Sequence, residues 1–107
     1  MTNKIILNIG LFDKDAKVQI IDTYEAFNLI NKAVLASKAY GATIWKADGI
    51  YMHNNGQIVK EPSICVEVID TDNTFKPNLD TLIEFLKKEL NQESIMVQEQ
   101  QINVQFK

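Results

Sequence analysis

Residues 42–70 read ATIWKADGIYMHNNGQIVKEPSICVEVID. Apolar and polar residues alternate through both halves of this stretch, which is typical of β-strands. The halves meet at Asn55-Gly56, a pair that tolerates the positive φ angles of a two-residue hairpin turn. Such a turn places Trp45 opposite Val66 and Gly49 opposite Pro62. We therefore predict a β-hairpin with strands over residues 42–53 and 57–70, and the rest of the fold is built around it.

The register of this hairpin divides its side chains between two faces of a sheet. The face expected to form the core receives Thr43, Trp45, Ala47, Tyr51, Ile64, Val66 and Val68. The opposite, open face receives Ile44, Lys46, Asp48, Cys65, Glu67 and Ile69. Because proline cannot donate a hydrogen bond within a central ladder, the part of the hairpin from about residue 49 to 62 is expected to bend or project from the sheet as an arm.

The flanking segments are predicted to supply further strands and helices. Residues 4–12 alternate as a strand that buries Ile5, Leu7, Ile9 and Leu11. Asp22 and Glu25 are spaced as the start of a helix, which Gly41 is expected to end. Asn78 can cap a second helix whose inward face carries Leu79, Leu82, Ile83, Leu86 and Leu90.

Residues 94–106 are expected to form the last strand. The phase of its apolar residues changes partway along, which predicts a bulge near residues 99–101. The break leaves open whether this strand pairs within its own chain or is exchanged with a second copy.

The resulting order is strand, helix, strand, strand, helix, strand. This βαββαβ order is typical of the ferredoxin-like α+β fold, in which both helices cover one face of an antiparallel sheet. We expect a single α+β domain over residues 1–107 with a protruding hairpin between its second and third strands. The uncovered face must meet water or another subunit, so we predict a homo-oligomer whose interface includes Ile44, Cys65, Glu67 and Ile69.

Composition excludes several classes of function. All 11 basic residues are lysines, against 14 acidic residues, for a net charge of −3. The absence of arginine, the usual residue for bidentate phosphate and guanine recognition, argues against a nucleic acid polymer as partner. No apolar run is long enough to span a membrane and the start of the chain lacks the pattern of a signal peptide. We expect a cytoplasmic protein that does not bind a membrane.

The sequence contains few residues in patterns typical of a metal site or a catalytic site. The single cysteine, Cys65, and the single histidine, His53, cannot form a disulfide or a zinc site within one chain. The Asp13-Lys14-Asp15 loop lacks the glycine and glutamate of a calcium loop. No phosphate-binding loop, nucleophile elbow or apolar-flanked carboxylate pair is present. We therefore assign no catalytic residue, metal or cofactor and favour a non-enzymatic protein.

A small-ligand site is predicted near the arm. If the arm bends at Gly49, Tyr51 and His53 leave the core and can stack on a base. Lys46 and Lys60 can neutralise phosphate as point charges. Asn8, on the open face of the first strand, completes the predicted ligand-binding residues.

Residues 41–63, GATIWKADGIYMHNNGQIVKEPS, together with residues 90–94, LNQES, resemble small, uncharacterised, ferredoxin-like proteins of bacteriophages and low-GC bacteria. The resemblance implies an interaction protein that counters a host defence and, if phage-encoded, works in the host cytoplasm. It implies no catalytic residue.

Three hypotheses follow. The first is a self-assembling protein that sequesters a small ligand, with nucleotides among the candidates. The second is an inhibitor that binds a host defence protein through the arm. The third is a small enzyme or ligand sensor of the dimeric α+β-barrel kind, with His53 or Glu67 acting in the cavity between two sheets.

Overall fold

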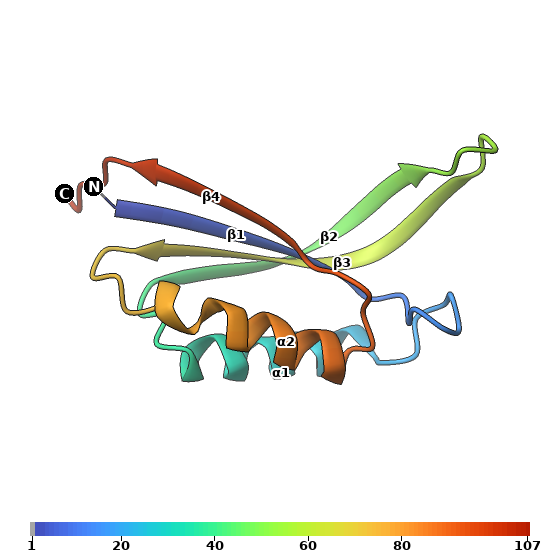
Figure 1. The fold of residues 1–107 in the computed structure, drawn as a ribbon, viewed down its shortest axis with the longest axis horizontal. Helices are drawn as coiled ribbons and strands as arrows, with labels where there is room; N and C mark the ends of the chain where they lie inside the picture. The colour runs from blue at the N-terminus through green and yellow to red at the C-terminus, as the bar shows by residue number, and fades with distance from the viewer. Residues whose placement is uncertain (1) are drawn as a thin grey trace.

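A computed structural model describes residues 2–107 and confirms the ferredoxin-like α+β fold. Within these residues the order is β1 (Thr2–Gly10), α1 (Thr23–Ala36), β2 (Ala42–Met52), β3 (Ile58–Asp70), the short 3-10 helix η1 (Lys76–Asn78), α2 (Leu79–Glu89) and β4 (Met96–Ile102). The strands form an antiparallel sheet in the order β2-β3-β1-β4. Both α1 and α2 lie against the same face of the sheet, as predicted (Figure 1). None of the helices in this part of the chain is long and apolar enough to cross a membrane.

The core lies between the helices and the middle strands. The alternating residues of β1 and of the loop after it are buried, namely Ile5, Leu7, Ile9 and Leu11. From β3 the core receives Ile64, Val66 and Val68, and the helices add Ala26, Ile30, Val34, Leu79, Leu82, Leu86 and Leu90. Each large apolar side chain buried in this layer stabilises the fold by roughly 1.5–3 kcal/mol. The apolar periodicity predicted this part of the core correctly.

The ends of the helices were predicted only in part. Asp22 caps α1 as expected, since its carboxylate accepts hydrogen bonds from the backbone N–H groups of Tyr24 and Glu25. The prediction that Gly41 ends α1 was wrong. The helix stops at Ala36, and the residue in the left-handed conformation after it is Lys38, with φ 65°. Asn78 precedes α2 but makes no side-chain cap, and its amide instead donates to the carbonyls of Ser37 and Thr74.

The hairpin turn differs from the prediction by one residue. The backbone N–H of His53 donates to Gln57 O (2.8 Å) and that of Gly56 to His53 O (2.9 Å), so the loop has three residues, 54–56. Gly56 takes the left-handed conformation at its end, with φ 86°. Three-residue loops of this kind are the next most common hairpin turns after two-residue ones. Trp45 therefore pairs with Cys65, and Asp48 rather than Gly49 lies opposite Pro62.

This one-residue difference reverses the faces of β2, because side chains alternate along a strand. Ile44 pairs with Val66 and packs against the core, so its predicted place on the open face was wrong. Trp45, predicted in the core, shares the open face with its partner Cys65 and is 40% exposed. Lys46 pairs with the core residue Ile64, so its predicted place on the open face was wrong as well. The assignments within β3 were correct.

Strand β4 is regular. It pairs continuously with β1 of its own chain, from Thr2 opposite Ile102 to Asn8 opposite Met96. The predicted bulge near residues 99–101 was wrong, because each of these residues pairs with one residue of β1. Glu99 lies opposite Ile5 on the face toward the helices, where its carboxylate forms a salt bridge with Lys76. The apolar phase changes after residue 97 because polar side chains occupy both faces of this edge strand.

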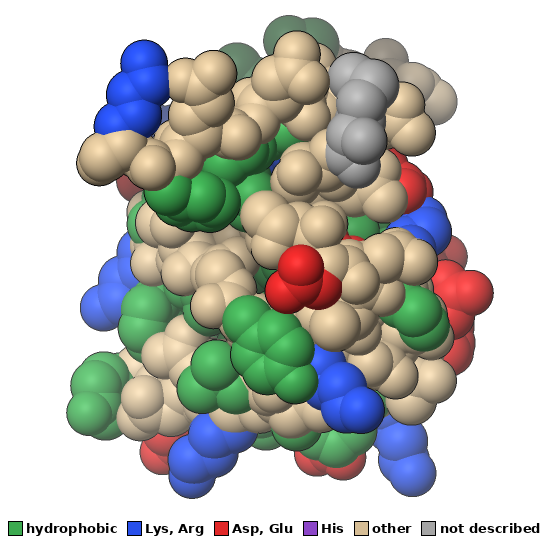
Figure 2. All heavy atoms as spheres, turned by 90° about the vertical axis from the view of Figure 1, so that its left-hand side faces the viewer, with side chains coloured by type: hydrophobic (Ala, Val, Ile, Leu, Met, Phe, Trp, Pro, Cys, Tyr) green, Lys and Arg blue, Asp and Glu red, His purple; other side chains and the backbone are tan. Residues whose placement is uncertain are grey.

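The hairpin of β2 and β3 extends past the ends of the helices and bends away from them, so the predicted arm is present (Figure 1). It makes the molecule elongated, with a longest extent of 45 Å against 26 and 23 Å in the other directions. Figure 2 shows the opposite end, where apolar side chains lie scattered among lysines and acidic residues without a patch of one charge in this view. The arm is therefore the feature that sets the two ends of the molecule apart.

Candidate functional site

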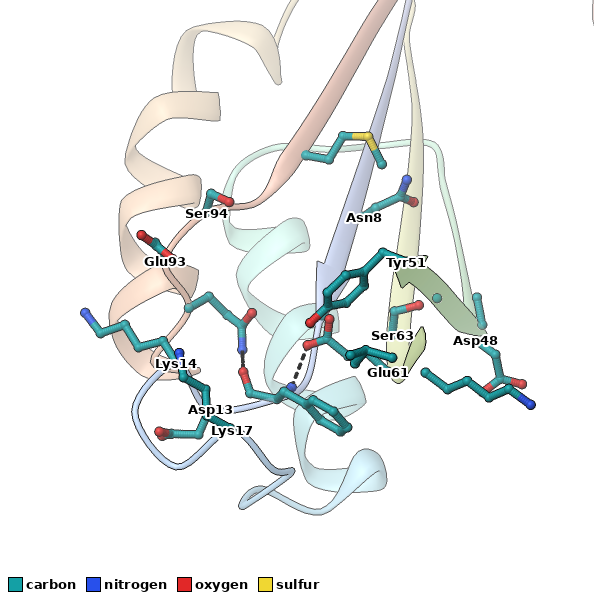
Figure 3. A pocket seen from close by; sticks show the side chains of 18 of the residues that line it. Asn8, Asp13, Lys14, Lys17, Asp48, Tyr51, Glu61, Ser63, Glu93 and Ser94 are labelled. Atoms are coloured by element: carbon teal, nitrogen blue, oxygen red, sulfur yellow. Dashed lines mark hydrogen bonds between the residues drawn. The ribbon is translucent and has the colours of Figure 1, made fainter. Parts of the chain in front are cut away.

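A hollow of about 1080 Å³ lies on the open face where the arm leaves the sheet. Its floor comes from the end of β1 and the middle of β3, with Asn8, Gly10, Ser63 and Cys65. The arm forms one wall, and the loops after β1 and α2 form the other (Figure 3). Segments far apart in the sequence therefore meet at the base of the arm.

Glu61 lies at the centre of this arrangement. Its Oε2 accepts a hydrogen bond of 2.8 Å from the backbone N–H of Phe12, just beyond the end of β1. The carboxylate lies directly over Gly10, where no side chain intervenes. A carboxylate held by a backbone N–H keeps one defined position and presents its remaining acceptor sites to the hollow.

Two aromatic side chains of the arm line the same hollow. Tyr51 and His53 are two residues apart, so both line the hollow, and their rings meet edge to face with centroids 5.4 Å apart. Figure 3 shows the Tyr51 side chain pointing from the arm toward the Glu61 carboxylate. A phenol, an imidazole and a fixed carboxylate thus line the same hollow.

The opposite wall is a polar loop held by several hydrogen bonds. Asp13 Oδ1 accepts the backbone N–H groups of Asp15 and Ala16, and the Asn91 amide donates to both Asp13 (2.8 Å) and Asp15 (2.9 Å). The hydrogen bond from Ala16, followed by that from Asn91, lowers the pKa of Asp13. The Gln92 amide donates to the carbonyl of Phe12 (2.7 Å) and ties this wall to the end of β1.

The side chains described around the hollow do not form a group of metal ligands. Within residues 2–107, no cluster of three or more His, Cys, Asp or Glu side chains is placed to hold a metal ion. The acidic side chains of the wall are occupied by hydrogen bonds from the loop backbone and from Asn91.

The structure brings together four of the five predicted ligand-binding residues. Asn8, Tyr51, His53 and Lys60 all line the hollow. Lys46 does not, because the register of β2 puts it on the other side of the sheet. Ligand binding by these residues stays a prediction.

The predicted interface residues divide in the same way. Cys65, Glu67 and Ile69 alternate along β3 on the open face, whereas Ile44 packs toward the helices. The Cys65 thiol donates to Asn8 Oδ1 (2.9 Å), and burial raises its pKa. Glu67 lies 3.9 Å from the Lys4 ammonium group across the strand pair. The thiol and this carboxylate are thus both occupied by neighbours on β1.

Glu61 is the residue that the sequence interpretation missed. In the sequence it lies between Lys60 and Pro62 and lacks the apolar neighbours that would mark a functional carboxylate. Its role depends on contacts with Gly10 and Phe12, about fifty positions earlier in the chain. A glycine at the end of a regular strand was the available signal, since glycine there often marks a close approach by another group.

Solved structures with this fold include proteins of different activities. A phage SAM lyase in complex with S-methyl-5'-thioadenosine aligns with a TM-score of 0.64 and 21% identity over 92% of this chain and 80% of the other. The periplasmic divalent cation tolerance protein CutA from Archaeoglobus fulgidus aligns with a TM-score of 0.62 and 16% identity over 100% and 89%. The GlnK–ATP complex of B. subtilis aligns with a TM-score of 0.52 and 10% identity over 92% and 84%. At these identities the likeness shows the fold.

No curated protein matches the chain in sequence. One family model, described as "Protein of unknown function (DUF3574)", matches residues 5–106. This span includes every strand in part or whole, both α-helices and the whole hollow at the base of the arm. The chain therefore belongs to the DUF3574 family.

Proposed function

We propose that this chain binds a small, positively charged adenosine derivative of the S-adenosylmethionine class in the hollow at the base of the arm. The observation that carries this proposal is the fixed carboxylate of Glu61, held by the Phe12 N–H in the hollow that Tyr51 and His53 also line. A fixed carboxylate favours a cationic group of a ligand, and an aromatic side chain offers a surface on which a purine can stack.

The charges around the hollow favour such a ligand over a polyphosphate. Its lining includes four acidic residues, Asp13, Asp48, Glu61 and Glu93, and three lysines, Lys14, Lys17 and Lys60. This near balance cannot neutralise a triphosphate, whereas it suits a ligand that carries a sulfonium, an ammonium and a carboxylate. The SAM lyase of the same fold, solved with S-methyl-5'-thioadenosine, supports the choice of an adenosine thioether.

Self-association is part of the proposal. The arm exposes Ile50, Met52 and Ile58, and the open face exposes Trp45 and Met96. A two-stranded ribbon with no core of its own is marginally stable in water. A second copy that packs against the apolar side chains of the arm stabilises the arm, and packing on Trp45 and Met96 covers the open face beside the hollow. We therefore expect a homo-oligomer with closed symmetry.

Binding is tested by titrating the purified protein with S-adenosylmethionine, S-adenosylhomocysteine and ATP in a calorimeter. We expect S-adenosylmethionine to bind most tightly, because its sulfonium carries the positive charge that S-adenosylhomocysteine lacks. Glu61→Gln keeps an acceptor for Phe12 but removes the negative charge, so it is expected to weaken S-adenosylmethionine by about tenfold or more and S-adenosylhomocysteine far less. Glu84→Gln, on the exposed side of α2, serves as the control. Equal losses for both ligands, or tighter binding of ATP, contradict the proposal.

Cleavage of the bound ligand is the second candidate, favoured by the Tyr51 side chain that points at the Glu61 carboxylate. In this step the carboxylate of the ligand attacks the carbon bonded to sulfur, so that a C–O bond forms as the C–S bond breaks. The electron pair of the broken bond goes to sulfur, and S-methyl-5'-thioadenosine and the lactone of the amino acid portion are released. Mass spectrometry of the compound released by cold acid, which does not itself cleave the sulfonium, decides between the two. Intact S-adenosylmethionine supports sequestration, and S-methyl-5'-thioadenosine supports cleavage.

Either activity removes a methyl donor from the cytoplasm, where we propose that the protein acts. Loss of this donor would impair a host defence that depends on methylation. If no adenosine derivative raises the melting temperature, the inhibitor of a host protein becomes the better hypothesis. A ligand at a hundred times its Kd stabilises a protein by about 2.7 kcal/mol, which a thermal shift detects.

A further inference from the structure

Gly10 is the last residue of β1 and pairs with Ser63 of β3. Its backbone does not require a glycine, since among the described glycines only Gly56 has a positive φ. A strand position without a side chain weakens the strand and calls for a reason in the surroundings.

The surroundings provide that reason. A Cβ atom at position 10 would lie 2.6 Å from the carboxyl carbon of Glu61 and 2.7 Å from its Oε1. Carbon atoms in contact are about 3.5–4.0 Å apart, so a methyl group and this carboxylate cannot occupy these places together. The carboxylate is the far end of a flexible side chain, so it moves while the strand stays in place.

We infer that Gly10 is a positioning residue for Glu61: the empty space above its Cα allows the carboxylate to reach the Phe12 N–H and to face the hollow. This inference rests on the proposed function, in which Glu61 binds the cationic group of the ligand. Any side chain at position 10 displaces the carboxylate, breaks its hydrogen bond with Phe12 and removes the charge from its place.

The test is a double-mutant cycle of Gly10→Ala and Glu61→Ala, with S-adenosylmethionine affinity as the readout. Gly10→Ala alone is expected to lower the affinity by about tenfold, comparable with Glu61→Ala, because each removes the charge-assisted contact. In the Glu61→Ala background the same substitution is expected to change the affinity by less than about twofold, since coupled sites are not additive. Gly41→Ala is the control, because a Cβ there meets only the Ile69 carbonyl oxygen at 3.7 Å.

A second readout does not need a ligand. Amide hydrogen exchange at Phe12 is expected to quicken in Gly10→Ala and in Glu61→Ala, while the melting temperature of Gly10→Ala stays close to that of the wild type. Unchanged exchange at Phe12 in Gly10→Ala overturns the inference, whatever the ligand is. An equal loss of affinity from Gly10→Ala in both backgrounds also overturns it, because Gly10 then acts on the ligand directly.

Failure of the proposed function gives a different result. If wild type and Glu61→Ala bind S-adenosylmethionine equally, or neither binds it, the ligand assignment is wrong. The exchange of Phe12 then still decides whether Gly10 positions Glu61.

Discussion

Strands β2 and β3 run without a break from the helix-covered part of the sheet into the arm, yet the two regions differ in how their apolar residues are placed. Those of the covered part are buried, and those of the arm are exposed to solvent. Ile5, Leu7 and Ile9 are fully buried beneath α1 and α2. On the arm, by contrast, the exposed fractions of Ile50, Met52 and Ile58 are 67, 66 and 60%. The covered part is stabilised by its own chain. The arm has no such cover, so its apolar residues are available to a second copy or another partner.

The largest expected effect is a loss of folding stability, which should be large for a substitution in the core and small for one on the arm. Phe75, which is fully buried, packs in the core beside α2. Phe75→Ala is expected to destabilise the protein by about 3–5 kcal/mol through lost burial and a cavity. Ile58→Ala on the arm is expected to change the stability of the monomer by less than about 0.5 kcal/mol. Urea denaturation at low protein concentration checks both, and equal losses would show that the arm has a core of its own.

Assembly should show the reverse sensitivity. The double variant Ile50→Ser, Ile58→Ser is expected to weaken self-association by about tenfold or more, since each buried isoleucine contributes roughly 1.5–3 kcal/mol. Sedimentation velocity over a dilution series measures this, with Leu35→Ser, an exposed residue of α1, as control. A wild-type protein that stays monomeric at tens of micromolar would falsify the proposed assembly.

Trp45 reports on the register of β2 and on the open face together. The observed pairing with Cys65 leaves its indole partly exposed, so iodide is expected to quench its fluorescence in dilute protein. Protection should increase as the protein assembles, because the open face becomes covered. Emission that iodide does not quench at any concentration would support the core position expected from a two-residue turn.

These contrasts also explain which features the sequence could predict. The burial of Ile5, Leu7, Ile64 and Val66 follows from period-two alternation, since only one phase of each strand is apolar. In β2 both sets of alternating residues include apolar ones, with Ile44 in one set and Trp45 in the other. The alternation therefore could not show that the predicted turn was one residue too short. Glu61 could not be assigned because its partners are distant in sequence.

The smallest expected effect concerns pH. Hydrogen bonds from the Ala16 backbone and Asn91 lower the pKa of Asp13 below the usual value of an aspartate. Ionised Asp13 therefore stabilises the folded protein at pH values above its pKa in the unfolded chain, and this stabilisation is lost as the pH falls through its lower pKa in the folded protein. Wild type and Asp13→Asn should therefore converge in stability as the pH falls below the ordinary pKa of an aspartate, about 3.9. Urea denaturation from pH 2 to 6 measures the difference, and a gap that widens toward acid contradicts this assignment.

The binding site is tested most directly by mapping bound S-adenosylmethionine through amide chemical shifts in NMR spectra. The largest shifts are expected at Phe12, Tyr51 and Glu61, around the hollow at the base of the arm. Little change is expected at Leu29 and Ala33 in the shallow groove of α1, where Phe85 of α2 provides an alternative apolar surface. Shifts confined to that groove, or none at saturating ligand, would contradict the claim that the hollow is an adenosine-binding site.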